Sequence, residues 1–184
     1  MREELSRAAW DLFTHKGYEK TTVAEIARAA GVSRRTFFRY HASKEDVLVA
    51  TSDAFAQAML DAVAARPVSE APLVAIRHAL VHVLEQEAER PDFMKGVIRL
   101  LRESPALRRA MLDRHARMEE RLAALLADRL RIHPERDSTP ALLAFLARAF
   151  FDTAFNVWYD QDRKDVAGLV DELFAKLRAL TRTL

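Results

Sequence analysis

The chain has 184 residues, 50% of them hydrophobic, and a formal net charge of +2. This length suits one or two small domains, and the four glycines and six prolines, with abundant alanine, leucine, arginine and glutamate, predict an all-helical protein. The absence of cysteine excludes disulfides, thiol catalysis and cysteine-ligated metals, and it fits the reducing cytoplasm.

Two helices are predicted before residue 31. The apolar residues of the first recur at helical spacing, and Gly17 ends it because glycine adopts a left-handed backbone at little cost. Thr21 or Thr22 caps the second helix, and Gly31 ends it. The apolar faces are Leu5, Ala8, Ala9, Leu12 and Phe13 in the first helix and Val23, Ile26, Ala27 and Ala30 in the second.

Seven further helices follow, with capping residues and prolines at their boundaries. Ser33 caps a third helix that runs to about His41, and the capping box at 43–46 opens a fourth that ends at about Ala65. Residues 65–72 are predicted to be a linker. Ser104-Pro105 and Thr139-Pro140 each have a capping residue followed by proline in the first turn. The remaining helices are predicted at 73–88, 93–103, 105–131, 140–160 and 166–182.

The location of the protein is predicted from what its segments lack. The N-terminal residues include two early carboxylates and no apolar secretion core. The longest wholly apolar run, Ala141–Ala147, is far shorter than the roughly 20 residues of a membrane span. We therefore expect a cytoplasmic protein without a membrane partner.

Positive charge is concentrated in one short window. Residues 26–44 contain five basic residues and no acidic one, so the rest of this +2 chain sums to −3. Ala27 is small enough for two helices to cross closely, and Gly31 tolerates the positive φ of the turn between them. The window therefore predicts a helix-turn-helix that binds a polyanion, and double-stranded DNA fits best.

The exposed side of the third helix supplies the candidate DNA contacts. Arginine at its N-terminal end can hold guanine O6 and N7 with two hydrogen bonds, and threonine can contact a thymine methyl or a phosphate. Phosphate contacts from Thr22, Tyr40 and Lys44 fix the register without reading bases. The predicted DNA-binding residues are Thr22, Ser33, Arg34, Arg35, Thr36, Phe38, Arg39, Tyr40 and Lys44.

The N-terminal segment resembles the DNA-binding domain of the tetracycline-repressor (TetR) family over about residues 3–50. The shared pattern comprises Gly17-Tyr18, Thr21-Thr22, Ala27 to Ser33, Thr36-Phe37-Phe38 and Ser43-Lys44-Glu45. The resemblance implies a dimeric transcriptional regulator, most often a repressor, that a small effector releases from DNA. It also implies that Arg34, Arg35 and Thr36 face bases, that Thr22 and Lys44 touch the backbone, and that Phe38 and Tyr40 flank the reading residues.

Three residues depart from the family pattern. Phe38 stands where tyrosine is common, so a hydroxyl contact to phosphate is lost, and Tyr40 stands where histidine is frequent. His41 occupies a position that is often apolar, which makes pH-sensitive packing a hypothesis.

Candidate effector residues lie in the C-terminal part. His78 and His82 are spaced four residues apart on a predicted helix, but the HExxH glutamate and an evident third ligand are missing, so we expect no metal and no cofactor. The predicted pocket residues are His78, His82, Met94, Met111, Phe151, Phe155 and Trp158, and an ordinary core role remains the alternative for each. A pocket of this composition suits an apolar or amphipathic effector.

The last two predicted helices carry broad apolar stripes. Packing them against a two-fold mate gives a four-helix bundle, so we predict a homodimer through 140–160 and 166–182 that matches two half-sites of a palindromic operator. We predict a DNA-binding domain over 1–46 and an effector-binding and dimerisation domain over 47–184, with the fourth helix as the lever between them. An enzyme on a helical bundle lacks a recognisable catalytic motif here, and an adaptor protein without an effector remains an alternative.

Overall fold

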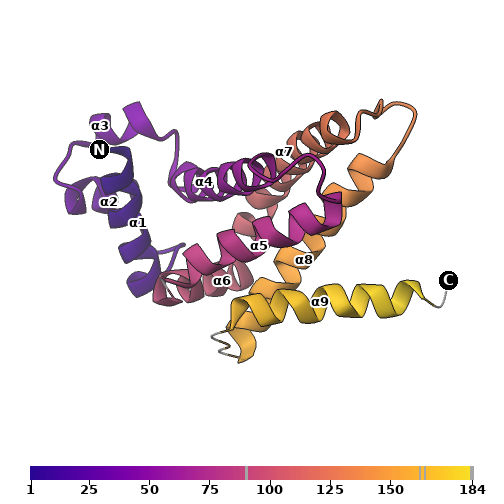
Figure 1. Cartoon of the computed structure of the whole chain (residues 1–184). Helices are drawn as coiled ribbons and strands as arrows, with labels where there is room; N and C mark the ends of the chain where they lie inside the picture. Colours follow the sequence, from indigo (N-terminus) through magenta and orange to yellow (C-terminus); the bar gives the residue numbers. More distant parts are fainter. Residues whose placement is uncertain (90, 162, 164, 183–184) are drawn as a thin grey trace. The chain divides into compact units, whose positions relative to one another are not determined.

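The computed structural model describes residues 1–89, 91–161, 163 and 165–182, and the side chains of residues 3, 48–52, 93 and 106 lie outside that description. The described residues form helices and no strand, which confirms the predicted all-α class (Figure 1). The helices are α1 (Arg2–Lys16), α2 (Val23–Ala29), α3 (Arg34–Tyr40), α4 (Lys44–Ala64), α5 (Pro72–Ala88), α6 (Pro91–Glu103), α7 (Pro105–Leu130), α8 (Thr139–Gln161) and α9 (Val166–Thr181).

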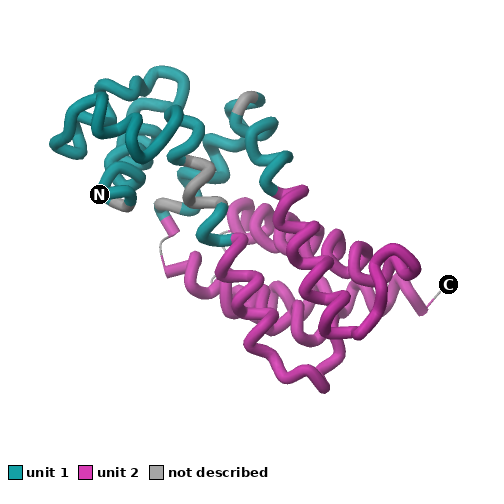
Figure 2. The backbone as a smooth tube through the Cα atoms, turned by 90° about the horizontal axis from the view of Figure 1, so that it is seen from above, with its two compact units in different colours: residues 1–55, 92–114 teal, residues 56–91, 115–184 magenta. Residues whose placement is uncertain are grey.

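The chain divides into two compact units (Figure 2). Unit 1 comprises Met1–Phe55 and Asp92–Arg114, and unit 2 comprises Ala56–Pro91 and His115–Leu184. Unit 1 therefore contains α1, α2 and α3 together with the start of α4, most of α6 and the start of α7. The functional boundary after residue 46 stays a prediction.

Local signals explain the path of the first three helices. Gly17 ends α1 with φ 90°, and Gly31 joins α2 to α3 with φ 68°, so both glycines occupy the left-handed region. Thr22 forms a complete capping box with Glu25, because its hydroxyl accepts from the Glu25 amide and the Glu25 carboxylate accepts from the Thr22 amide. Ser33 accepts from the Thr36 amide at 3.1 Å and begins α3.

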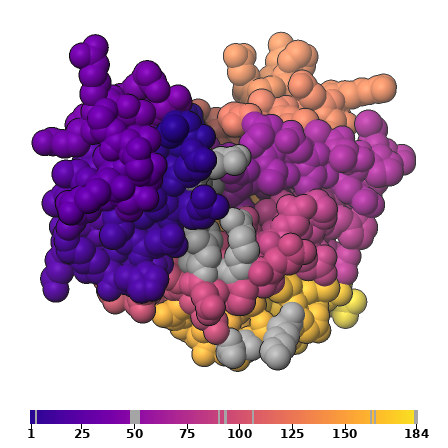
Figure 3. Space-filling model, turned by 90° about the vertical axis from the view of Figure 1, so that its left-hand side faces the viewer, coloured from indigo at the N-terminus to yellow at the C-terminus, as the bar shows by residue number. Residues whose placement is uncertain are grey.

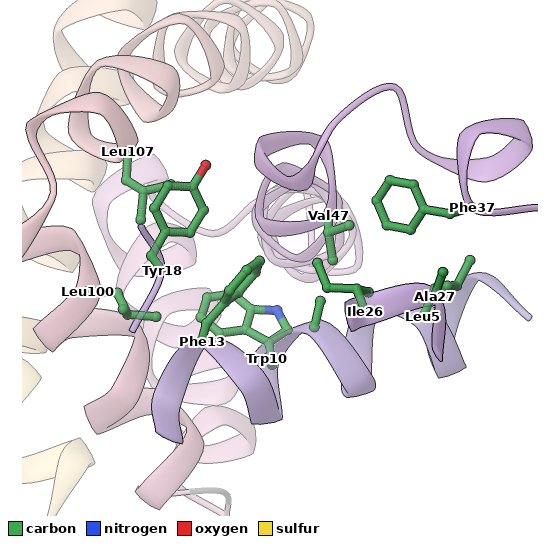
Figure 4. Close-up of a cluster of buried hydrophobic side chains, with 11 residues drawn as sticks. Leu5, Trp10, Phe13, Tyr18, Ile26, Ala27, Phe37, Val47, Leu100 and Leu107 are labelled. Atoms are coloured by element: carbon green, nitrogen blue, oxygen red, sulfur yellow. The ribbon is translucent and has the colours of Figure 1, made fainter. Parts of the chain in front are cut away.

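The core of unit 1 is formed by residues from six helices and the loop after α1 (Figure 4). Phe13, Ile26 and Phe37 are fully buried at its centre. Helices α6 and α7 add Leu100 and Leu107, so the helix-turn-helix does not form a core on its own. The buried members are Leu5, Ala9, Trp10, Phe13, Tyr18, Ile26, Ala27, Phe37, Val47, Leu100 and Leu107.

Unit 2 is built on α5, α8 and α9, each of which contacts the other two. Phe150 of α8 stacks on Phe174 of α9 with ring centroids 4.1 Å apart. By length and composition alone α8 is apolar enough to cross a membrane, with a mean hydropathy of 1.3 over its most apolar window. The sequence prediction considered only uninterrupted apolar runs, and it therefore did not identify α8 as a helix long and apolar enough to cross a membrane. A soluble core helix meets the same criterion, and the inner side of α8 is buried in unit 2.

Two helix starts differ from the prediction. Thr139 lies within α8 rather than before it, because the Asp137 carboxylate accepts from the Thr139 amide at 2.8 Å and takes the capping role. At the start of α4, Ser43 accepts from the Asp46 amide as expected, but the Asp46 carboxylate accepts from the amide of Ala42 rather than of Ser43. The capping box there is therefore shifted by one residue.

Candidate nucleic-acid interface

Phe37 anchors helix α3 in the core, and the adjacent Phe38 is exposed. Phe37 is fully buried, whereas 49% of Phe38 is exposed, and the two rings meet edge to face at 5.5 Å. Adjacent positions on a helix lie about 100° apart, so anchoring Phe37 turns Phe38 outward. Arg2 also holds the helix, since its guanidinium donates to the Tyr40 carbonyl at 3.0 Å. The sequence analysis missed that contact, whose only signal is a basic residue at the chain start.

The arginines at the start of α3 are free cations. Arg34 and Arg35 are exposed, and neither forms a hydrogen bond or an ion pair with the described residues. Long side chains stand away from the violet part of the surface in Figure 3, which belongs to the N-terminal residues. Arg39 differs, because its guanidinium lies 5.0 Å from the Tyr40 ring centroid and donates to the Tyr40 hydroxyl at 3.3 Å.

The hydroxyl groups near α3 already have local partners. Ser33 Oγ lies 3.0 Å from Thr36 Oγ1, and the Thr22 hydroxyl donates to Glu25 at 3.0 Å. A hydrogen bond from Lys16 is the largest cause that lowers the pKa of Glu25 to about 2, so Glu25 is ionised at neutral pH. The capping box at the start of α2 is therefore stable at neutral pH, and Thr22 remains exposed beside it.

Lys44 is surrounded by carbonyl groups. Its ammonium donates to the carbonyls of Tyr18 at 2.9 Å, Thr21 at 3.2 Å and Glu19 at 3.4 Å, and it lies 4.2 Å from the Tyr18 ring centroid. The Tyr18 hydroxyl donates to Glu45 at 2.5 Å, and burial followed by this bond raises the pKa of Tyr18. Lys44 thus ties the start of α4 to the loop before α2, and its predicted phosphate contact stays a prediction.

His41 is buried without a hydrogen bond. The residue is 2% exposed, and neither ring nitrogen has a hydrogen-bond partner among the described residues. Its Nδ1 lies 3.6 Å from Asp46, and its ring centroid lies 5.7 Å from that of Phe37. Burial is the main cause that lowers the pKa of His41, with the charge of Asp46 opposing it, so the ring is neutral at physiological pH.

The predicted effector residues are distributed over both units. Met94 and Met111 are buried in unit 1, and the others belong to unit 2. Phe151, Phe155 and Trp158 form a row of stacked rings on α8 with centroid distances of 5.1 and 6.1 Å. His78 pairs with Glu70 at 2.9 Å, and His82 lies 3.2 Å from Gln86. In the part of the chain described here, no group of three or more acidic or histidine residues is placed to hold a metal ion.

Comparison with known proteins decides the family. The model of bacterial regulatory proteins of the tetR family matches residues 5–51, and that of the MftR C-terminal domain matches residues 70–182. The regulator TcmR of Streptomyces glaucescens is 36% identical over 174 residues, covering 91% of this chain and 77% of TcmR. The chain belongs to the TetR family. This TetR-family protein is therefore a transcriptional regulator with a DNA-binding helix-turn-helix, as the sequence pattern predicts.

Solved structures agree with the assignment. FadR of Thermus thermophilus, a TetR-family repressor solved with lauroyl-CoA, is 29% identical with a TM-score of 0.52, covering 94% of this chain and 90% of FadR. FadR of Bacillus subtilis, solved with stearoyl-CoA, has a TM-score of 0.66 at 19% identity, covering 94% of this chain and 95% of that protein, and it shows a shared fold.

Proposed function

We propose that this regulator is a dimeric, effector-responsive repressor that reads a palindromic operator with one α3 in each half-site. The observation that carries the proposal is the pair of exposed arginines, Arg34 and Arg35, at the N-terminal end of a helix anchored by Phe37. The other proposed contacts are Thr22, Ser33, Thr36, Phe38, Arg39, Tyr40 and Lys44.

Arginine suits this role for geometric reasons. A guanidinium donates two parallel hydrogen bonds to guanine in the major groove, and each good pair discriminates by about 1–3 kcal/mol. The N-terminal end of a helix adds its own partial positive charge toward the DNA. Phe38, which is half exposed beside the arginines, contributes apolar contact such as that with a thymine methyl.

An exposed apolar face on α8 supports dimerisation. Leu142 and Phe145 are each 58% exposed, although both are large hydrophobic residues on a helix of the predicted dimer interface. Such a face is stable when a second copy covers it, and a two-fold dimer then presents two α3 helices to two half-sites.

We propose an apolar or amphipathic effector for this regulator. The stacked row of Phe151, Phe155 and Trp158 gives apolar surface, and the FadR relative from Thermus thermophilus was solved with lauroyl-CoA. An effector that binds best to the conformation without DNA weakens operator binding. Linkage then requires that the operator weakens effector binding by the same factor.

Selection of bound duplexes from a random DNA pool tests the proposal directly. We expect an inverted repeat whose half-sites contain guanine at the positions that the arginines read. The Arg34→Ala/Arg35→Ala variant should lose this preference, whereas the matched Arg109→Ala/Arg117→Ala variant, which removes two other exposed arginines, should keep it. Selection of no motif by the wild type, or of the same motif by the α3 variant, would overturn the reading role.

Repeating the selection with lauroyl-CoA and with dodecanoate tests the effector. Release of the selected duplex at micromolar ligand supports an acyl-type effector. Retention of the duplex with both ligands at millimolar concentration would count against this effector class while leaving the DNA-binding assignment intact.

A further inference from the structure

The last turn of α1 and the loop that follows it receive contacts from elements far apart in the sequence. We call residues 14–21 the α1–α2 junction. Lys44 at the start of α4 donates to three carbonyls of this junction. Arg99 of α6 and Ser104 at the start of α7, each 85 residues further along than its partner, also hold it. Since α2 begins only two residues after the junction, its position bears directly on the helix-turn-helix.

Close packing joins α6 to the end of α1. A Cβ atom built at Gly96 would lie 2.5 Å from Cγ2 of Thr14, a separation that real side chains do not adopt. The two helices therefore approach closely because position 96 has no side chain. One turn further along α6, the Arg99 guanidinium donates to the Thr14 carbonyl at 2.9 Å and satisfies a backbone acceptor in the last turn of α1.

The α6–α7 connection makes a second contact with the junction. The hydroxyl of Ser104, which is 4% exposed, donates to the Glu19 carboxylate at 3.2 Å and accepts from the Leu107 amide at 3.3 Å. Ser104 is thus the N-cap of α7 and a partner of the junction at the same time. Lys44 donates to the backbone carbonyl of the same Glu19, so α4 and α7 meet at one residue.

Apolar packing supports these polar contacts. Leu100 and Leu107 are 3% and 1% exposed within the cluster that also contains Phe13 and Tyr18, and Figure 4 shows them on the side of the cluster where Tyr18 lies. Helix α6 is therefore part of the packed core that supports α3.

We propose that α6 and the start of α7 clamp the α1–α2 junction and so set the angle at which α2 and α3 meet DNA, with Gly96, Arg99 and Ser104 as positioning residues. This inference rests on the proposed operator binding. It adds a second element to the lever predicted for α4. A displacement of α6 moves the end of α1 and the residues that precede α2, because packed helices shift as bodies rather than deform.

The sharpest test is Gly96→Ala. Helix propensity alone favours alanine over glycine, so a residue without a positioning role should tolerate the change or gain stability. The clamp predicts the opposite for DNA: the added methyl group separates α6 from α1, and affinity for the selected operator falls at least tenfold while the midpoint of thermal unfolding changes little. Thr14→Ser removes the clashing Cγ2 and retains the hydroxyl, so Gly96→Ala/Thr14→Ser should recover affinity to within threefold of wild type.

Hydrogen exchange in the absence of DNA separates this inference from the proposed function. In Gly96→Ala we expect faster exchange at the amides of residues 14–21, with unchanged exchange in α8 and α9. Arg99→Ala should act in the same direction, and Arg109→Ala, an exposed arginine of the same unit without a junction contact, should not. Affinity within twofold of wild type in Gly96→Ala, or unchanged exchange at 14–21, overturns the clamp even if operator binding is established. Loss of protection throughout the chain that Thr14→Ser does not repair also overturns it, because it indicates a general folding defect.

Discussion

Arginine is used differently in α3 and in unit 2. In unit 2, Arg66 donates twice to Glu70, Arg148 bridges Glu119 and Asp152, and Arg163 donates twice to Glu172. At the start of α3, Arg34 and Arg35 have no such partner among the described residues. The difference does not follow from residue type, because the same guanidinium serves both regions. It follows from the neighbours, since residues 26–44 contain no carboxylate.

This contrast indicates where an external anion can bind. A paired guanidinium must lose a carboxylate before it can bind a phosphate or a base, whereas a free one exchanges only water. In unit 2 the Arg66 hydrogen bond is the largest cause that lowers the pKa of Glu70 to about 2, so the pair remains ionised throughout the neutral range. Charge concentrated on α3 is therefore available for DNA, whereas the paired arginines of unit 2 serve the fold.

The largest expected effect comes from removing the free arginines. Arg34→Ala/Arg35→Ala should weaken binding to the selected operator by about 2–6 kcal/mol, since each bidentate pair contributes about 1–3 kcal/mol of discrimination. Binding to a scrambled duplex should change much less. Fluorescence anisotropy with both duplexes at one fixed salt concentration measures the two affinities. An equal loss on both duplexes would mean that these residues contribute charge without reading sequence.

A paired arginine should show the reverse pattern. Arg129 donates to the carbonyls of Arg66, Pro67 and Glu70 in the α4–α5 connection. Arg129→Gln should destabilise the protein by about 2–3 kcal/mol, because hydrogen bonds from a charged group are strong and the carbonyls lose their donor. Sequence discrimination on DNA should persist. Urea unfolding measures the loss as a lower midpoint at an unchanged slope, with the exposed Arg117→Gln as the matched control.

His41 makes the stability of unit 1 depend on pH. Burial lowers its pKa in the folded protein, so the unfolded chain binds a proton more readily than the folded one and stability falls as the pH drops below about 6.5. Between pH 8 and pH 5.5 this group should therefore make the folded protein progressively less stable. Asp46 and Arg2 face the ring with opposite charges, and the Asp46 carboxylate lies 3.6 Å from Nδ1.

The comparison of wild type with His41→Phe isolates this contribution. Urea unfolding of both proteins at pH 5.5 and pH 8 should show a wild-type loss at acid pH that exceeds the loss of the variant. If the two proteins lose the same stability, other groups account for the acid sensitivity. Operator affinity measured at the same two pH values should follow the stability difference only if protonation disturbs the packing of α3.

Local signals made most of the fold predictable. Glycine at a positive φ, serine or threonine before a helix and proline in its first turn act within a few residues, so they identify helix boundaries from the sequence. Apolar spacing likewise predicted the burial of Ile26, and the assignment of Phe38 to the exposed side of the third helix agrees with its 49% exposure. The start of α8 was misplaced because Asp137 competed with Thr139 for the same capping role.

Contacts between distant segments were not predictable in this way. Nothing local to Gly96 indicates Thr14 as its neighbour, and a glycine inside a helix gives no clue to what approaches it. Lys44 was assigned to phosphate as a basic residue beside the third helix, yet the carbonyls that surround its ammonium come from a loop more than 20 residues earlier in the chain. Which partner a long cationic side chain chooses depends on tertiary structure, and a motif records only that the position is basic.

Lys44 is expected to give the smallest and most diagnostic effect. If its ammonium also reaches a phosphate, Lys44→Gln should weaken binding to all duplexes alike and reduce the slope of log affinity against log salt by about 0.9, because one fewer counterion is released. Titrations from 50 to 200 mM salt with the selected and the scrambled duplex measure that slope. An unchanged slope accompanied by a lower unfolding midpoint would confine Lys44 to the carbonyls of Tyr18, Glu19 and Thr21. The lysine would then belong with the arginines of unit 2 as a cation that serves the fold, and direct contact with DNA would rest on α3 and its other flanking residues.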